Sequence, residues 1–409
     1  MKNLLTVGIL GLLMLSSCSQ QDSPSFPDNV QQREVSENLL PLEEAVEIAN
    51  DFINGISGDA TRADRHPVSV EMYTDDATRS EDEDALLGYY VMNFGNDEGF
   101  AIVSADRRNG PMYAFSDEGS LHISDTTDNP GLRYYMLSLP GGGINPGDLI
   151  GPGGPGITPP DKPFTPILKV EVAPLLHANV RKWHQEYPFN KYCPDIAKCG
   201  SNTLVGCAAL SAGMIMSYFE WPTTYAGYTF NWTAMKNDIY NDSLARILAM
   251  IGQPNNLHIV YGYLASSAND LAAAYRRTFN NFGYKTIKTQ EFSESAARAA
   301  IKGSNGNSPI IISGMSSGAL GHAWVLDGIF YAKTIPTSAV IQPGDEKKYD
   351  EFYALHCVWG WKDNKNNGYF RFIQNTVGDS PVHHESDETG ETLGYTFGDL
   401  DIYYDFVKK

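Results

Sequence analysis

Cys207 has the residue type and the sequence context of a catalytic nucleophile. It follows Gly206 and opens a run at 208–218 in which apolar residues recur at helical spacing. Exposed N–H groups and the positive end of the dipole at a helix start favour the thiolate, which is the attacking species. Gly206, which has no side chain, leaves space for a substrate to approach the sulfur. Taken alone, Cys207 fits a small buried core cysteine slightly better, so the hypothesis requires a base.

His322 and Gln185 can supply the other groups that acyl transfer at a thiolate requires. His322 follows Gly321 at the start of a strand-like run, where a rigid sheet would hold its ring as general base and acid. Gln185 offers a side-chain amide that would stabilise the oxyanion beside the backbone N–H of Cys207. Spacing by itself makes Gln185 a weak candidate, because glutamines are common on protein surfaces. The three residues together predict acyl transfer at a cysteine.

The composition excludes several classes of protein. The 409 residues include 30 Lys and Arg against 49 Asp and Glu, which gives a formal charge of −19. Such an acidic surface repels phosphate backbones, so nucleic acid is not an expected partner. A hydrophobic fraction of 42% suffices for packed cores in two or three domains. The five cysteines match no zinc spacing.

Residues 1–17 have the pattern of an export signal. An apolar stretch follows Lys2 and is too short to span a membrane. The sequence Leu15-Ser16-Ser17-Cys18 resembles a bacterial lipobox, in which the cysteine is lipidated and becomes the mature N-terminus. An ordinary cleaved signal with an incidental cysteine is the alternative. We predict a lipoprotein signal at 1–17, lipidation of Cys18 and a polar tether at 18–37.

The next part of the chain predicts a small α+β domain followed by a linker. Apolar residues from Leu42 to Ile53 recur at helical spacing, and strand-like runs at 89–94 and 100–104 form a hairpin signal. Glycine and proline then dominate residues 141–166, a composition that supports neither a helix nor a central strand. We predict a domain at 38–140 and an exposed linker at 141–166, where proteases cut. Lys162 and Lys169 are the candidate activation sites.

The second domain, at 167–409, also reads as α+β. Its clearest helix follows Cys207 and ends before Trp221-Pro222, and a shorter helix is expected from Ser293 to Lys302. The remainder is strand-like, with antiparallel strands expected at 309–313, 322–331, 353–361 and 369–372.

These segments resemble one known family in their order and spacing. The residues that carry the resemblance are Trp183-x-Gln185, Tyr187-Pro188-Phe189-Asn190, Cys193-Pro194, Val205-Gly206-Cys207-Ala208, Gly321-His322-Ala323-Trp324, Trp359-Gly360-Trp361 and Asn367-Gly368-Tyr369-Phe370. They are similar to the streptopain family of bacterial cysteine peptidases over most of 170–409. Residues Gly99-Phe100-Ala101-Ile102-Val103-Ser104-Ala105-Asp106 are similar to the inhibitory propeptide of that family.

The resemblance implies a papain-like α+β peptidase of two subdomains at 167–409, with an inhibitory propeptide at 38–140 and an activation region at 141–166. Cys207 would be the nucleophile, His322 the general base and acid, and Gln185 the oxyanion donor, with support from Gly206, Gly321 and Trp359. The implied protein is a lipid-anchored endopeptidase made as a zymogen. It would be exported to the envelope or surface of a bacterium, or released after processing. Its partners would be protein or peptide substrates, its own propeptide, and the membrane through a lipid on Cys18. The resemblance implies that neither a metal nor a cofactor is expected.

One departure from the family pattern bears on activity. Val358 stands where the family usually has asparagine, and valine cannot orient an imidazole by hydrogen bonding. We expect reduced rather than absent activity. The alternative is a catalytically degenerate homologue that binds proteins or glycans at the surface. Cys193 and Cys199 form a local disulfide or stay free, and Cys357 is expected to be a buried core thiol.

Overall fold

The computed structural model describes most of the chain beyond the predicted signal and tether. The described residues are 39–57, 65–73, 88–122, 124–125, 129–139, 146–150, 164–198, 200–263, 266–315, 321–336, 350–361, 365–373, 385–386, 392–393 and 400–409. Residues 38–409 form one compact unit. None of the helices in these ranges is long and apolar enough to cross a membrane. The predictions for 1–37, including lipidation of Cys18, lie outside the described residues.

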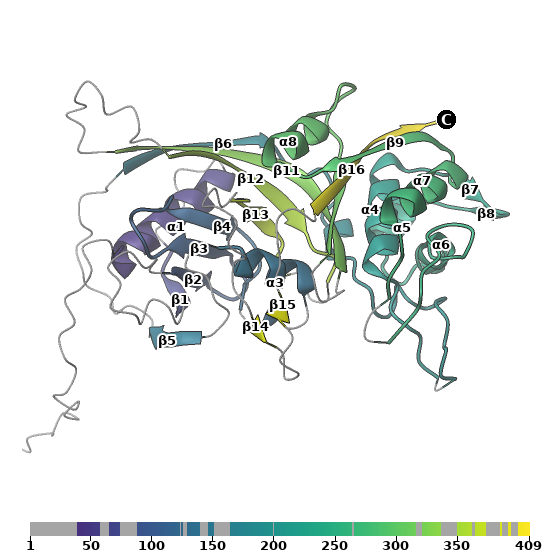
Figure 1. The fold of residues 1–409 in the computed structure, drawn as a ribbon, viewed down its shortest axis with the longest axis horizontal. Helices are drawn as coiled ribbons and strands as arrows, with labels where there is room; N and C mark the ends of the chain where they lie inside the picture. The colour runs from purple at the N-terminus through teal and green to yellow at the C-terminus, as the bar shows by residue number, and fades with distance from the viewer. Residues whose placement is uncertain are drawn as a thin grey trace, which may run out of the picture. The chain divides into compact units, whose positions relative to one another are not determined.

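A twelve-stranded sheet runs through the described residues and organises the fold (Figure 1). Its strands follow the order β5-β1-β2-β3-β4-β13-β12-β11-β10-β16-β9, and β6 also pairs with β11. The strands are β1 (Pro67–Tyr73), β2 (Tyr89–Phe94), β3 (Phe100–Ser104), β4 (Met112–Ser116), β5 (Pro146–Ile150), β6 (Phe164–Val172), β9 (Tyr284–Glu291), β10 (Ile310–Met315), β11 (Gly321–Pro336), β12 (Asp350–Val358), β13 (Gly368–Phe370) and β16 (Leu400–Lys408). Three further pieces are short: β7 with β8 (Thr224–Tyr225, Tyr228–Thr229), β14 with β15 (Glu385–Ser386, Thr392–Leu393), and the 3-10 turn η2 (Val180–Lys182).

The two parts of the chain meet in the middle of this sheet. Strand β4 from the N-terminal part pairs antiparallel with β13, with Phe115 opposite Tyr369 and Ala114 opposite Phe370. Strands β1 to β5 therefore lie on one side of this junction, and the strands that follow residue 200 lie on the other. The backbone ladder makes one continuous sheet out of two sequence regions.

Helix α1 (Leu42–Ser57) adds a shared hydrophobic core to this junction. Ala45, Ala49, Phe52 and Ile53, which recur at helical spacing, are buried, and Leu42 and Val46 are partly buried. The ring of Phe52 lies 5.2 Å from Phe115 of β4, 6.3 Å from Phe330 of β11 and 5.9 Å from Phe352 of β12, centroid to centroid. One side chain thus contacts strands of both regions, and separating them would expose aromatic surface to water.

The helices of the second region gather beside β10, β16 and β9, on the right in Figure 1. They are α4 (Cys207–Phe219), α5 (Trp232–Asn237), α6 (Asp242–Ile251) and α7 (Leu271–Asn281). Residues 208–217 of α4 are all buried, so α4 is a core helix enclosed by its neighbours. Gly213 permits the close approach of α6, since a Cβ there would lie 2.5 Å from Leu248 Cδ2. The first residue of α4 is therefore held by a rigid core.

The sequence predicted several elements correctly. Helix α1, the hairpin of β2 and β3, and α4 with its end before Trp221 agree with the expected ranges. Helix α8 (Glu294–Lys302) begins after Ser293, whose hydroxyl accepts a hydrogen bond from the Ala296 N–H as an N-cap. The sequence did not predict α5, α6 and α7, since it indicates mostly strands outside α4 and α8 in the second region. The α+β fold class is confirmed.

The predicted linker at 141–166 needs a correction. Residues Pro146–Ile150 form β5, which pairs antiparallel with β1 at the end of the sheet, and residues from Phe164 onward belong to β6. Proline is tolerated at the start of an edge strand, because the missing N–H faces no neighbouring strand. The region therefore contributes strands to the sheet on both sides of the junction, and the boundaries at 140 and 167 stay predictions.

We expect the two regions to stay associated after the chain is cut between residues 150 and 164. The β4–β13 ladder and the core around Phe52 hold them together without the covalent connection. Trypsin treatment stopped once only this connection is cut, before the N-terminal region is digested further, followed by size-exclusion chromatography in native buffer tests this expectation. The two fragments should co-elute in native buffer and separate in concentrated urea. Separate elution in native buffer would contradict it.

Candidate active site

Cys207 occupies the first position of α4, as predicted. Gly206 is the N-cap residue and has a φ of 91°, a conformation that a residue with a side chain rarely adopts. A Cβ on Gly206 would also lie 3.3 Å from the backbone oxygen of Ser266. Glycine at 206 is thus required by the turn into the helix, in addition to the predicted space for a substrate.

The thiol of Cys207 lies against β11. It is half-buried, and hydrogen bonds from the backbone of Ala323 and Ala208 favour its ionised form. Burial has the larger effect and raises the pKa of Cys207 above its ordinary value. The sequence predicted a favoured thiolate, so this expectation fails for the uncut chain. Cys207 does begin the helix as expected, but burial changes the pKa of its thiol more than the backbone N–H groups at the helix start do.

His322 is the second residue of β11 and is buried among tryptophans. Its ring stacks on Trp324 at 5.8 Å and meets Trp361 edge-on at 5.7 Å, centroid to centroid. Its Nε2 lies 2.9 Å from the backbone oxygen of Trp359. Burial lowers the pKa of His322 to about 4, and the bond to the Trp359 carbonyl only partly opposes this shift. The ring is therefore neutral at pH 7.

Cys207 and His322 lie on neighbouring elements and have different hydrogen-bond partners. The thiol reaches the backbone of Ala323, which follows His322 in the sequence, while the imidazole bonds to Trp359. Among the described residues, no hydrogen bond joins the sulfur to the ring. The structure thus places the predicted pair on adjacent elements, with the sulfur and the imidazole hydrogen-bonded to other groups and not to each other.

A short helix of the N-terminal region covers His322. Helix α3 (Pro130–Leu137) begins with Asn129 as N-cap and Pro130 as its first residue. A Cβ on Gly131 would lie 2.7 Å from His322 Cδ2 and 2.8 Å from Trp359 Cε3. Only a glycine can pack this closely, so the backbone of α3 rests directly on the imidazole. The sequence analysis missed α3, although Asn129-Pro130 is a recognisable helix start.

Gln185 has an amide group that is free to bind. Its side chain is buried, and among the described residues its Nε2 has no hydrogen-bond partner. Its backbone oxygen accepts a hydrogen bond of 3.0 Å from the Val205 N–H, two residues before Cys207. A buried amide donor without a partner costs free energy, which suits a group that awaits a ligand.

Trp359 and its neighbours support the imidazole. Strand β12 ends at Val358, so Trp359 lies beyond the strand and its carbonyl is available to His322. The Trp359 N–H donates to Asn367 Oδ1 at 3.1 Å, and its indole N–H donates to the Asn366 oxygen at 3.0 Å. Val358 is buried in the apolar cluster against which Cys207 packs. The sequence analysis missed this use of the two asparagines, because no local pattern links them to Trp359.

A buried pair fixes β11 beside this site. His356 Nδ1 lies 2.5 Å from Asp327 Oδ1, and Asp327 is fully buried. The second carboxylate oxygen of Asp327 accepts a hydrogen bond of 2.9 Å from the Leu176 N–H, and the backbone oxygen of Asp327 accepts one from the Leu175 N–H. Asp327 therefore anchors the segment that leads to Gln185 onto the strand that carries His322.

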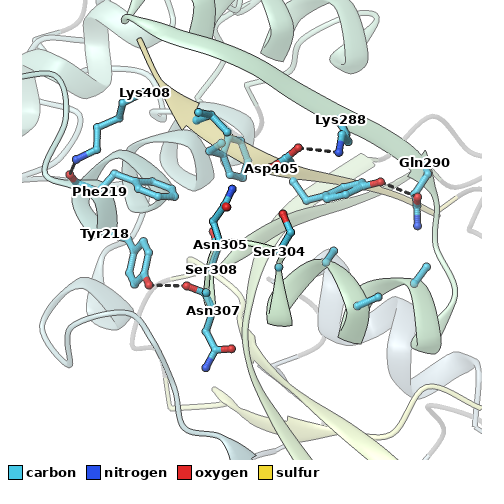
Figure 2. Close-up of a pocket in the computed structure, with 18 residues that line it drawn as sticks. Tyr218, Phe219, Lys288, Gln290, Ser304, Asn305, Asn307, Ser308, Asp405 and Lys408 are labelled. Carbon is cyan, nitrogen blue, oxygen red and sulfur yellow. Dashed lines mark hydrogen bonds and ion pairs between the residues drawn. The ribbon is translucent and has the colours of Figure 1, made fainter.

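A second hollow lies at the opposite end of α4 from Cys207 (Figure 2). It has a volume of about 820 Å³ and is lined by Tyr218, Phe219 and the loop at 303–308. Its polar groups pair with one another, as Lys288 does with Asp405 at 2.8 Å. Because it borders the last turn of α4, it is separate from the predicted catalytic pair.

Among the described cysteines, Cys193 and Cys357 form no hydrogen bond with Cys207 or His322. Cys193 and Cys357 are buried free thiols, as expected for Cys357, while Cys199 lies outside the described residues. Within the described ranges, no three His, Cys, Asp or Glu side chains gather as metal ligands. Gly321 is exposed at the start of β11, opposite Met315.

The two regions of the chain are similar to a cysteine peptidase and to a protease inhibitor. Residues 183–370 match the model of the Peptidase C10 family, and residues 30–138 match that of the Spi protease inhibitor. The first match covers a little under half of the chain and agrees with the resemblance to the streptopain family found in the sequence.

Three known proteins or fragments are similar to this chain. The thiol protease/hemagglutinin PrtT of Porphyromonas gingivalis is 23% identical over 339 residues, covering 72% of this chain and 35% of PrtT. The chain thus spans about a third of that relative. A fragment of Prevotella intermedia prointerpain A has a TM-score of 0.45 and 19% identity over 78% of this chain and 96% of its own. Active interpain A from the same organism has a TM-score of 0.36 and 19% identity over 57% and 93%.

We expect His322 to titrate at about pH 4 in the uncut chain. Removal of α3 hydrates the ring, so its pKa should rise toward the ordinary value of 6.5. Because the covered state has the lower pKa, falling pH through this window should favour the uncovered state. NMR titration with His322→Gln as the assignment control measures the shift. A pKa near 6.5 in the uncut chain would contradict the covered arrangement.

Proposed function

We propose that this chain is the zymogen of a cysteine endopeptidase whose nucleophile is Cys207 and whose base is His322. The observation that carries the proposal is the position of Cys207 at the start of α4, with its thiol against the residue that follows His322. The match of residues 183–370 to the Peptidase C10 model supports the same assignment. The substrates are proteins or peptides.

The proposed reaction uses three groups of this chain. Once uncovered, the His322 ring takes the proton of the Cys207 thiol, and the sulfur attacks the carbonyl carbon of the scissile peptide bond. The Gln185 Nε2 and the backbone N–H of Cys207 stabilise the negative oxygen that develops. His322 then gives its proton to the leaving amine, and a water molecule hydrolyses the thioester. The unpartnered amide of Gln185 supports its role.

The N-terminal region is the inhibitor in this proposal. Its α3 packs Gly131 against His322 and Trp359, where it blocks the approach of a substrate to the imidazole. The same cover withholds water from the ring, so His322 stays neutral and bonded to the Trp359 carbonyl. Activation then requires cleavage of the connection and removal of α3. Lys169 pairs with Tyr331 within the sheet, so Lys162 is the better placed of the two candidate cleavage sites.

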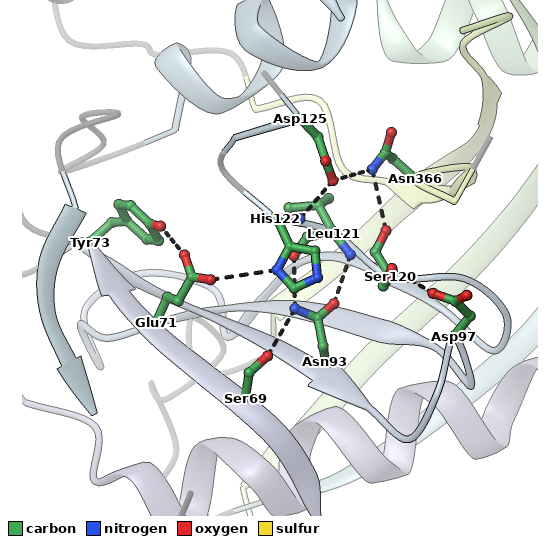
Figure 3. A network of polar contacts seen from close by, with 10 residues as sticks. All are labelled: Ser69, Glu71, Tyr73, Asn93, Asp97, Ser120, Leu121, His122, Asp125 and Asn366. Carbon is green, nitrogen blue, oxygen red and sulfur yellow. Dashed lines mark hydrogen bonds and ion pairs between the residues drawn. The ribbon is translucent and has the colours of Figure 1, made fainter. Parts of the chain in front are cut away.

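A polar network, which we call the clasp, joins the inhibitor to the peptidase (Figure 3). Asp125 Oδ2 accepts from the Asn366 amide at 2.7 Å and from the His122 N–H at 2.8 Å. At the exposed rim, Asp97 pairs with Lys365 at 2.9 Å. Asn366 also accepts from the indole of Trp359 through its backbone oxygen. The clasp therefore connects the inhibitor to the residue that holds His322.

The proposed location of the protein follows from its first residues. The lipobox-like Leu15-Ser16-Ser17-Cys18 supports export and lipid anchoring through Cys18. The enzyme would then act at the bacterial envelope or surface, or after release by processing. Globomycin sensitivity of the processing step in the native host, together with radiolabelled palmitate incorporation, tests this part.

We expect Cys207→Ala to abolish cleavage of casein under reducing conditions after limited trypsin treatment. We expect Gln185→Ala to lower kcat by about a hundredfold or more, because it removes one oxyanion donor. Initial rates on casein and on a fluorogenic peptide provide the measurement. Trypsin must trim parent and variants to the same core for the comparison to hold. If the parent also fails to cleave either substrate, the alternative of a binding protein on a peptidase scaffold is favoured. Val358, which stands where the family usually has asparagine, supports that alternative.

We expect Asp125→Ala to accelerate activation severalfold, because it leaves the buried Asn366 amide short of a partner, at a cost of about 1–3 kcal/mol to the covered state. Asp97→Ala is the matched control, since its ion pair is exposed and such pairs contribute about 0–1 kcal/mol. The lag before peptide hydrolysis after trypsin addition is the measurement. Equal lags in both variants and the parent would show that the clasp does not restrain the inhibitor.

A further inference from the structure

We propose that four tyrosines beside Gln185 form a docking surface for the polypeptide substrate outside the catalytic cleft. The four, here called the tyrosine strip, are Tyr187, Tyr192, Tyr228 and Tyr240. This inference rests on the proposed peptidase function and adds to it a determinant of substrate length. The occupant is an extended segment of the protein being cleaved.

The strip exposes large aromatic surface to solvent. Tyr187 and Tyr240 are each 65% exposed and Tyr228 is 43% exposed, whereas most large apolar side chains of this protein are buried. The rings of Tyr187 and Tyr240 contact each other, with their centroids 6.3 Å apart. Adjoining exposed aromatic rings mark interaction sites more often than isolated ones do. Ile239, next to Tyr240, extends the same surface.

A single cation links the other two tyrosines. The guanidinium carbon of Arg246 lies 4.2 Å from the ring centroid of Tyr192 and 4.7 Å from that of Tyr228. Arg246 belongs to α6, and Tyr240 lies just before that helix. Lys191, beside Tyr192, pairs with Asp242 of α6 at 2.5 Å. The four tyrosines therefore gather around the start of α6.

The strip is held rigid by backbone contacts. The Asn202 amide donates to the backbone oxygens of Asn190 at 3.1 Å and Lys191 at 2.8 Å. The Asn190 amide donates in return to the backbone oxygens of Asn202 and Thr203. These bonds fix the turn that carries Tyr187 and Tyr192. A preorganised surface loses little conformational entropy on binding, and tyrosine offers wide contact area with few rotatable bonds.

The position of the strip indicates what it binds. Tyr187 is two residues from Gln185, whose backbone oxygen accepts the Val205 N–H two residues before Cys207. Two residues of chain span at most about 7 Å, so the backbone of Tyr187 lies close to that of Gln185, the proposed oxyanion donor. Tyrosine rings and a guanidinium contact both the backbone and the side chains of an extended peptide. The strip is exposed while His322 is covered, so it is available before activation.

The test compares a long and a short substrate. The full chain is activated with trypsin, and kcat/KM is measured on casein and on a fluorogenic peptide of a few residues. We expect Tyr187→Ser with Tyr240→Ser to lower the ratio of casein to peptide kcat/KM about tenfold, mainly through KM. Tyr187→Phe with Tyr240→Phe should restore most of the ratio, because the rings remain. Tyr331→Ser, a tyrosine of β11 outside the strip, should leave it unchanged.

A binding measurement separates this inference from the proposed function. Full-length Cys207→Ala, with and without the two serine substitutions, is passed over immobilised casein, and the dissociation constants are compared. A loss of about tenfold in affinity supports the strip whether or not the parent hydrolyses peptides. Unchanged affinity, or an unchanged casein-to-peptide ratio, overturns it. Absence of peptide hydrolysis by the parent overturns the proposed function instead.

Discussion

The pairing of β4 with β13 is the contact on which the rest of the structure depends. It aligns Ala114 and Phe115 with Phe370 and Tyr369 and so joins the strands of the N-terminal and C-terminal regions into one sheet. A β-ladder fixes both direction and register, so the two regions meet in a single orientation. Phe52 then packs across the junction, and α3 comes to rest on the end of β11 that carries His322.

Burial keeps both members of the proposed catalytic pair uncharged. It raises the pKa of the Cys207 thiol and lowers that of the His322 imidazole, so both groups are uncharged at neutral pH. Low pH also weakens a contact at the exposed edge of the covered arrangement, the ion pair between Asp97 and Lys365. The pKa of Asp97 is lowered mainly by its bond to Lys365, and a carboxylate with a lowered pKa stabilises the closed state less as pH falls. The histidine and the carboxylate therefore change the stability of the cover in the same direction.

One turn serves both chemistry and substrate recognition in the proposed enzyme. The segment that begins at Gln185 is bound to Val205 at one end and to Asn202 further along. The same set of backbone bonds thus sets the oxyanion donor at a fixed place relative to Cys207 and presents Tyr187 and Tyr192 at the surface. A rigid support for both would keep a bound substrate in register with the sulfur.

The sequence by itself determined the elements and the residue types of the site. Helical spacing predicted α1 and α4, Ser293 predicted the start of α8, and ordered motifs singled out Cys207, His322 and Gln185 as candidate site residues, because these signals are local. Short helices such as α5 lack such signals and depend on packing against their neighbours. Only the tertiary structure decided that Gly131 covers His322, that the Trp359 carbonyl holds its ring, and that burial overrides the helix dipole at Cys207. Those outcomes depend on contacts between residues far apart in the chain and on the exclusion of water, and neither leaves a pattern in the residues nearby.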